Sequence, residues 1–215
     1  MKNLLLIVSA FILLTAFCDD KIKGNGKITT QSRTLQSFSS ISVGGSMDIT
    51  IDQNGKENAD VETDENLQDL VITEVKDHSL NIHLKENSKV SYTKMIIHVS
   101  CKTLNEISSG GSGDCKSVST IKNDALKIAH GGSGNFDLNT EVKELSISSG
   151  GSGDFKLKGE ATSLNISAAG SGDINAQELS CTSAKISMAG SGDVKLKKGV
   201  KASVSSVGSG EVSYE

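Results

Sequence analysis

The sequence predicts an all-β protein: a right-handed parallel β-helix (solenoid) with coils of about 20 residues, less regular toward the N-terminus. The first observation is a motif, Gly-Ser-Gly followed by a polar residue, which occurs six times in the second half of the chain. The second is its spacing, since consecutive serines of the motif lie 21, 19, 19, 20 and 18 residues apart. A fixed turn at a period near twenty is typical of a solenoid in which one repeat forms one coil. The six copies are Gly111–Asp114, Gly132–Asn135, Gly151–Asp154, Gly170–Asp173, Gly190–Asp193 and Gly208–Glu211.

The third observation is that apolar residues alternate with polar residues on both sides of each turn, the pattern of half-buried strands. Five residues before the serines stand Ile107, Ile128, Ile147, Ile166, Ile186 and Val204. Seven before them stand Leu126, Leu145, Leu164, Ala184 and Ala202, with Leu104 one place out of register. Three and five residues after the serines stand Cys115, Phe136, Phe155, Ile174, Val194 and Val212, then Ser117, Leu138, Leu157, Ala176, Leu196 and Tyr214. Each coil therefore reads as strand, tight turn, strand and return loop, and like residues of stacked coils would form a continuous core.

The turn itself is expected to depend on its glycines. Both glycine positions hold in all six copies, which indicates either a positive φ or a close approach of backbones at a corner. The polar residue after the second glycine can accept hydrogen bonds from turn N–H groups. The turn-forming residues are Gly111, Gly113, Gly132, Gly134, Gly151, Gly153, Gly170, Gly172, Gly190, Gly192, Gly208 and Gly210.

The pattern extends toward the N-terminus in a weaker form. Ile41–Ile51 matches the repeat with Ser46 at the serine position, although Met47 replaces the second glycine, and Gly24–Ile28 fits the same frame 21 residues earlier. The 66 residues between Ser46 and Ser112 correspond to about three periods. They offer four strands, expected to pack as further coils or as an antiparallel cap, and one helical turn at Glu65–Leu70. The expected strands are Ala59–Thr63, Val71–Val75, Leu80–Leu84 and Met95–Val99. We expect one domain over residues 24–215, with the Gly-Ser-Gly-Asp repeats in 101–215.

The N-terminus predicts export. Residues 1–17 read as a signal peptide, because Lys2 precedes an apolar run of about fourteen residues, too short to span a bilayer comfortably. Leu14–Cys18 resembles a bacterial lipobox, although Phe17 stands where such motifs carry a small residue. We therefore expect lipidation at Cys18, with residues 18–23 as the linker and simple secretion as the alternative; two or three acyl chains make a stable membrane anchor. The predicted location is the cell envelope, as an outer-membrane lipoprotein facing the periplasm or the exterior.

Composition limits the function classes. The net charge is −4 and Arg33 is the only arginine, which argues against nucleic-acid binding. Beyond Cys18 the chain has three cysteines, so at least one thiol is free unless it pairs between chains. Cys115 falls on an inward row and reads as a core residue, Cys181 lies several coils from the others, and a Cys101–Cys115 bridge is left open.

The polar residues after the turns are the sharpest candidate site. In stacked coils Asp114, Asp154, Asp173 and Asp193, with Asn135 and Glu211, would line one edge. This row reads either as turn capping or as a cation ladder, for example for Ca²⁺, which takes several oxygen ligands. No other metal site, catalytic residue or cofactor is predicted. The histidines lack metal-ligand spacing: His78 and His130 read as turn residues, and His83 and His98 as outward positions on strands. The serines sit in Gly-Ser-Gly with no helix behind them, unlike a nucleophile elbow.

The chain resembles a known family. Gly24-Asn25-Gly26, the stretch Ile41–Ile49 and the Gly-Ser-Gly-Asp series together are similar to the auto-transporter adhesin family with the head GIN domain. The resemblance implies a right-handed parallel β-helix without enzymatic activity or cofactor. It favours a lipid-anchored envelope protein that presents a rigid solenoid to an unknown protein or glycan ligand. A periplasmic scaffold and a small carbohydrate-active β-helix enzyme are the alternatives. An uncovered edge on the last coil also predicts possible homo-oligomers.

Overall fold

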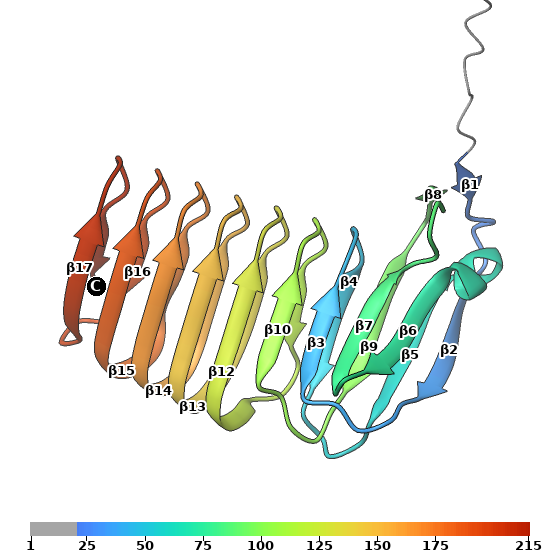
Figure 1. The fold of residues 1–215 in the computed structure, drawn as a ribbon, viewed down its shortest axis with the longest axis horizontal. Coiled ribbons are helices and arrows are strands. Elements are labelled where there is room, and N and C mark those ends of the chain that lie inside the picture. Colours follow the sequence, from blue (N-terminus) through green and yellow to red (C-terminus); the bar gives the residue numbers. More distant parts are fainter. Residues whose placement is uncertain (1–20) are drawn as a thin grey trace, which may run out of the picture.

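The computed structural model describes residues 21–215, and its strands stack side by side along one axis (Figure 1). The early strands are β1 (Ile22–Lys23), β2 (Ile28–Thr34), β3 (Ser40–Val43), β4 (Asp48–Asp52), β5 (Asn58–Asp64), β6 (Val71–Lys76), β7 (Ser79–Leu84), β8 (Val90–Ser91) and β9 (Met95–Ser100). The later strands are β10 (Glu106–Ser109), β11 (Cys115–Ser117), β12 (Ile121–His130), β13 (Phe136–Ser149), β14 (Phe155–Ala168), β15 (Ile174–Met188), β16 (Val194–Leu196), β17 (Lys201–Ser206) and β18 (Val212–Tyr214). The predicted helical turn is present as the 3₁₀ helix η1 (Glu65–Leu70).

The strands form two ladders on opposite sides of the Gly-Ser-Gly turns. We call the ladder before the turns the pre-turn face; from β7 it runs through β3, β10, β12, β13, β14 and β15 to β17, all paired in parallel. We call the ladder after them the post-turn face; it runs from β9 through β4 and β11 to β18, also in parallel. The long strands β13, β14 and β15 contribute to both faces. The predicted β-solenoid is therefore confirmed, with a twentyfold repeat that emerges as one coil per Gly-Ser-Gly turn.

Register between coils places like residues on like residues, as predicted. Ile107 pairs with Ile128, and the column continues in the same register through Ile147, Ile166, Ile186 and Val204. The isoleucines are at most 3 % exposed. Phe136 and Phe155 stack with ring centroids 4.8 Å apart and planes 8° from parallel, a spacing set by the rise between coils. Burial of these columns is the main source of stability, because one coil alone has nothing to cover its apolar row.

The stacking order differs from the order of the chain at the N-terminal end. The coil made by β3 and β4 lies between the coil of β7 and β9 and the coil of β10 and β11. The coil of Ser46 thus directly contacts the coil of Ser112, although 66 residues separate them. Only one further coil comes from the intervening segment. The rest of it forms an antiparallel cap, in which β5 pairs with β9 and β2, and β6 pairs with β7.

The cap is closed by the single arginine of the chain. Arg33 lies on β2 and donates to the carbonyls of Val71 (2.6 Å) and Gln68 (2.8 Å), and to the Thr73 hydroxyl (3.2 Å). Its guanidinium therefore bridges β2 to η1 and β6, the two sides of the solenoid at this end.

The expectation that Gly24–Ile28 forms the corner of an earlier coil is wrong. β2 starts at Ile28 and pairs only with β5, in antiparallel orientation. The glycines instead wrap around the buried carboxylate of Asp64, which accepts hydrogen bonds from the Gly26 N–H (2.7 Å), the Thr93 N–H (2.7 Å) and the Thr93 hydroxyl (3.0 Å). A Cβ at Gly24 would collide with this carboxylate. These hydrogen bonds, that of the Thr93 N–H first, lower the pKa of Asp64.

At the other end, the last coil has a neighbour on one side only. Among residues 21–215, β17 pairs with β15 and β18 with β16, and the side chains of Val204 and Tyr214 are each 44 % exposed. The homo-oligomer stays a prediction. Within the described part of the chain, no helix is long and apolar enough to cross a bilayer. The predicted signal peptide and Cys18 lie outside the described residues.

Candidate functional site

The turn glycines form an edge along which the backbones of successive coils touch. A Cβ at Gly111 would fall on the carbonyl of Gly45, and a Cβ at Gly132 on the carbonyl of Gly111; the other turn glycines repeat the pattern. Of the twelve, only Gly208 has a positive φ, 135°. Of the two reasons expected for these glycines, close backbone approach is thus the general one, and it acts between coils.

The polar residues after the turns form a hydrogen-bonded ladder along the same edge. The Oδ1 atom of each accepts a hydrogen bond from the backbone N–H of its counterpart in the next coil. The donor and acceptor pairs are Asp114 to Asp48 (2.9 Å), Asn135 to Asp114 (2.8 Å), Asp154 to Asn135 (3.0 Å), Asp173 to Asp154 (2.8 Å), Asp193 to Asp173 (2.8 Å) and Glu211 to Asp193 (2.9 Å). An acceptor oxygen suffices for this role, which explains why Asn135 can replace aspartate.

The aspartates therefore cap the neighbouring coil, not their own turn. Within residues 21–215, no group of three or more His, Cys, Asp or Glu side chains is arranged to hold a metal ion. The cation ladder of Asp114, Asp154, Asp173 and Asp193 stays a prediction, and the geometry gives these carboxylates a structural role in any case.

The post-turn face carries charges of both signs. Over its central coils lies a hollow of about 420 Å³, lined among others by Lys116, Asp137, Lys156 and Lys195. Two of its charged side chains are already paired: Asp137 with Lys158 (2.9 Å) and Lys156 with Glu178 (3.3 Å). Exposed pairs of this kind contribute little stability, but they occupy the side chains that a charged ligand would use.

The pre-turn face is built differently, because short side chains cover it. A hollow of about 590 Å³ lies over β10, β12, β13, β14 and β15. Its outward residues are Glu106, Lys127, Ala129, Ser146, Ser148, Asn165, Ser167, Lys185 and Ser187. Lys127 and Lys185 belong to one row, three coils or about 14 Å apart. Neither forms an ion pair with another residue of the described part of the chain, so two available cations flank a floor of hydroxyl groups.

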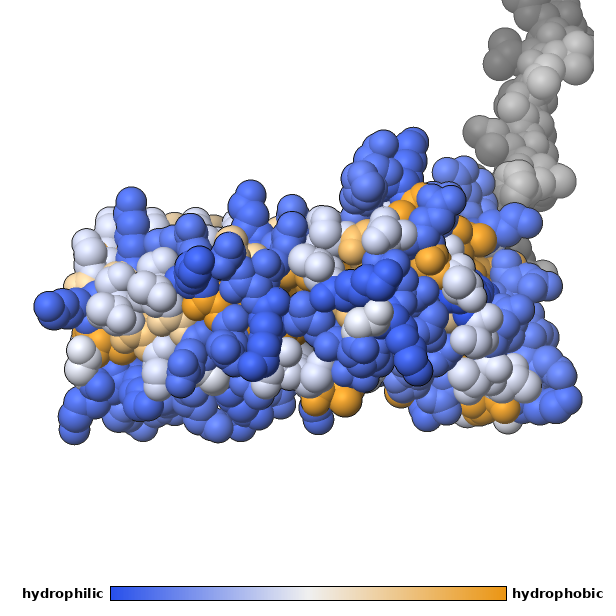
Figure 2. Space-filling view, turned by 90° about the horizontal axis from the view of Figure 1, so that it is seen from below, coloured by the Kyte–Doolittle hydropathy of each residue, from blue (hydrophilic) through white to orange (hydrophobic). Residues whose placement is uncertain are grey.

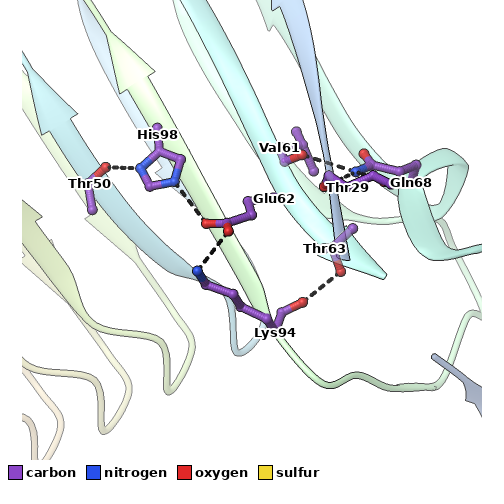
Figure 3. Close-up of polar contacts among 8 residues, drawn as sticks. All are labelled: Thr29, Thr50, Val61, Glu62, Thr63, Gln68, Lys94 and His98. Carbon is purple, nitrogen blue, oxygen red and sulfur yellow. Dashed lines mark hydrogen bonds and ion pairs between the residues drawn. The ribbon is translucent and has the colours of Figure 1, made fainter. Parts of the chain in front are cut away.

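A third group of polar side chains joins the cap to the first coils (Figure 3). The Thr50 hydroxyl and His98 Nδ1 are 2.8 Å apart, His98 Nε2 lies 3.3 Å from Glu62 Oε2, and Lys94 Nζ lies 2.7 Å from Glu62 Oε1. Hydrogen bonding by Lys94, more than the other contacts, lowers the pKa of Glu62. A line of hydroxyl, imidazole and carboxylate can activate a nucleophile. Here the ammonium of Lys94 holds the carboxylate, and the line connects β4, β9 and β5 across the outer face.

The sequence gave only part of this group. His98 was expected on the outer face and lies there, with its side chain 43 % exposed. Its partners are 48 and 36 residues away, and their meeting depends on the antiparallel packing of β5 against β9. Strand alternation predicts which residues point outward, but it does not predict which strands become neighbours.

The interpretation of His130 as a turn residue is wrong. It is the last residue of β12, is 4 % exposed, and its ring lies 5.0 Å from Phe136 and 5.9 Å from Phe155, edge-on to both. Its Nδ1 lies 3.2 Å from the Ser109 carbonyl oxygen, and its Nε2 has no partner. Desolvation lowers the pKa of His130.

The three described cysteines are free thiols. Cys115 is buried on the inward row, as expected, and burial raises its pKa to about 12. Cys101 is also buried, with a pKa raised to about 11 mainly by desolvation. The Cys101–Cys115 bridge does not form, and at these pKa values neither thiol is a nucleophile near neutral pH.

Comparison with known proteins identifies the family. The family model described as "Putative auto-transporter adhesin, head GIN domain" matches residues 37–215. The chain belongs to this family. The head GIN domain thus includes the coil of Ser46, the cap and all six Gly-Ser-Gly turns, while β1 and β2 precede the matched region.

Solved structures agree with this assignment. A crystal structure of a putative adhesin from Bacteroides fragilis is 27 % identical, with a TM-score of 0.83, and the match covers 90 % of this chain and 100 % of that one. A structure described as a putative lipid binding protein from Parabacteroides distasonis is 25 % identical, with a TM-score of 0.71, covering 91 % and 100 %. A putative adhesin from Parabacteroides merdae is 25 % identical, with a TM-score of 0.66, covering 91 % and 99 %. No curated protein matches the chain. Family and neighbours are named as adhesins or a binding protein, which points to the cell surface or envelope.

Proposed function

We propose that this head GIN protein is a non-enzymatic lipoprotein of the cell envelope that presents a rigid β-solenoid for adhesion or binding. The family and the named neighbours support a binding role. The lipobox-like segment ending at Cys18 supports the anchor. The single observation that carries the proposal is the pre-turn face, with its hollow of about 590 Å³ floored by small hydroxyl side chains and flanked by unpaired lysines.

The repetition of the face supports binding through many weak contacts. Ser148, Ser167 and Ser187 occupy equivalent positions on successive coils, about 4.8 Å apart. A ligand with its own repeat, such as a polysaccharide or an extended protein segment, can form the same contact at each coil. Such contacts add up because the solenoid holds them in fixed positions.

Turnover is no part of the proposal. The Thr50–His98–Glu62 line holds its carboxylate against Lys94, and its geometry is accounted for by the attachment of β5 to the first coils. The net charge of −4 disfavours nucleic acid as the ligand.

The binding role is tested on arrays of glycans and extracellular proteins. We expect wild-type protein to bind a subset of the array and Ser167→Trp, which fills the pre-turn hollow, to lose that binding at least about tenfold. Thr162→Trp is the matched control, since Thr162 is equally exposed on β14 but lines a different hollow. Binding that survives Ser167→Trp and is lost in Thr162→Trp would place the ligand on another face and contradict the proposal.

The anchor and its orientation are tested on whole cells. Mass spectrometry of the mature protein is expected to find acyl chains on Cys18, and protease treatment of intact cells is expected to remove the domain. Loss only after the outer membrane is permeabilised would instead identify a periplasmic scaffold, the alternative that the same envelope location allows.

A further inference from the structure

The segment that leads from Cys18 into the domain is fixed to the body from its first described strand. The Ile22 N–H donates to the Lys89 carbonyl (2.8 Å), and the Gly24 N–H donates to the Ser91 carbonyl (2.7 Å). Asn66 then holds the segment twice, accepting from the Asn25 N–H and donating to the Lys23 carbonyl, both at 2.9 Å. With Asp64 bound to the Gly26 N–H, residues 22–26 have no slack relative to the solenoid.

This attachment limits how far the domain can stand from its anchor. Three residues separate Cys18 from Ile22, so the connection spans at most about 14 Å even when fully extended. A lipid on Cys18 therefore keeps β1 and β8 at the bilayer surface. A domain meant to move freely would need a long flexible linker between the two.

The surface around β1 and β8 has the chemistry of a membrane contact. Ile22 is 42 % exposed and Tyr92, directly after β8, is 37 % exposed. The Tyr92 hydroxyl donates to the Ser46 carbonyl, which fixes the ring. Lys21, Lys23 and Lys89 are exposed beside them. Aromatic rings and lysines are the residues that favour the headgroup region, where the ring meets the acyl boundary and the ammonium meets phosphate.

The rest of the molecule disfavours lying flat. The Gly-Ser-Gly turns lie on the same side of the molecule as β1 and β8 (Figure 1). That edge carries Asp114, Asp154, Asp173, Asp193 and Glu211, whose charges a phosphate-rich surface repels. The space-filling view shows a mostly hydrophilic surface along the length of the stack (Figure 2).

We propose that the β1–β8 end docks on the lipid headgroup region, so that the solenoid points away from the bilayer with its last coil furthest out. This inference rests on the Cys18 anchor of the proposed function. In this pose the pre-turn face is held sideways, clear of the membrane, at a fixed orientation.

Single tryptophans test the pose, because the chain has none of its own. The lipidated full-length protein is placed in phosphatidylcholine–phosphatidylglycerol vesicles with and without brominated acyl chains, which quench nearby tryptophan. Tyr92→Trp is expected to lose about half of its emission or more in brominated vesicles, as a residue at the interface should. Tyr214→Trp, at the far end, and Ser191→Trp, on the turn edge, are the controls and are expected to be unchanged.

The outcomes separate the inference from its premise. Protein that floats with the vesicles but shows no quenching at Tyr92→Trp overturns the docking and leaves the anchor intact. Quenching at Ser191→Trp as strong as at Tyr92→Trp shows a molecule lying on its turn edge, which also overturns it. Protein that carries no lipid on Cys18 and stays in solution contradicts the proposed function, and the docking with it.

Discussion

At the scale of single residues, a turn glycine matters for the space between coils. In Gly153→Ala the new Cβ would collide with the Gly134 carbonyl and lie 2.8 Å from His130 Nε2. We expect a loss of about 1–3 kcal/mol in the free energy of unfolding, measured by urea denaturation. Gly150→Ala is the matched control, since nothing lies within 4 Å of a Cβ there. Equal stability of the two variants would show that the coils do not touch at this edge.

The phenylalanine column tests the interior in the same way. Phe155 is 1 % exposed and stacks on Phe136. Phe155→Ala removes the ring and leaves a cavity between rigid neighbouring coils, so we expect it to cost about 3–5 kcal/mol by urea denaturation. A change below about 1 kcal/mol would mean that the ring is not packed in the core.

His130 links stability to pH. Because desolvation lowers its pKa in the folded state below the ordinary value near 6.5, protonation favours the unfolded state. Its contribution is fully present above that value and is lost as the pH falls through the folded-state pKa. We expect the wild type to lose more stability between pH 7 and pH 5 than His130→Leu does, in urea unfolding at both pH values. Parallel losses in the two proteins would contradict the burial of a neutral imidazole.

At this scale the sequence predicted positions better than causes. It located the twelve turn glycines and the aspartate row, because each repeats at the coil period. It misplaced His130, since a single histidine before a turn carries no sign that two phenylalanines of the next coils will cover it. It also left open whether the glycines answer to φ or to contact, which only the neighbouring backbone decides.

At the scale of elements, the N-terminal cap depends on Arg33. Replacement by methionine keeps much of the apolar stem but removes the donors to Val71, Thr73 and Gln68. We expect faster amide hydrogen exchange in β2, β6 and η1, with β13 to β15 unchanged. Faster exchange throughout the solenoid would show that the cap and the coils unfold as one unit.

The strands were predictable and their order was not. Ala59–Thr63, Val71–Val75, Leu80–Leu84 and Met95–Val99 fall within β5, β6, β7 and β9. Their alternation specifies a buried face but not a partner. The coil of Ser46 therefore gave no sign that it would be inserted between two coils from later in the chain, nor Gly24–Ile28 that it would enclose Asp64 and not form a corner.

At the scale of the whole molecule, one arrangement accounts for both the core and the proposed role. Coils in register give columns of buried residues inside and rows of equivalent side chains outside. The cap closes one end and fixes the chain leading to Cys18, so the proposed anchor and the binding face become parts of one rigid body.

The register at the inserted coil is the most direct test of this account. Thr50 and Lys116 are partners on adjacent parallel strands, at a separation that suits a disulfide, although 66 residues apart in the chain. In a background with Cys101, Cys115 and Cys181 replaced by alanine, we predict that Thr50→Cys with Lys116→Cys forms an intramolecular disulfide under mild oxidation. Lys116→Cys with Lys195→Cys, several coils apart, should not. A bridge in the second pair and none in the first would contradict the stacking order.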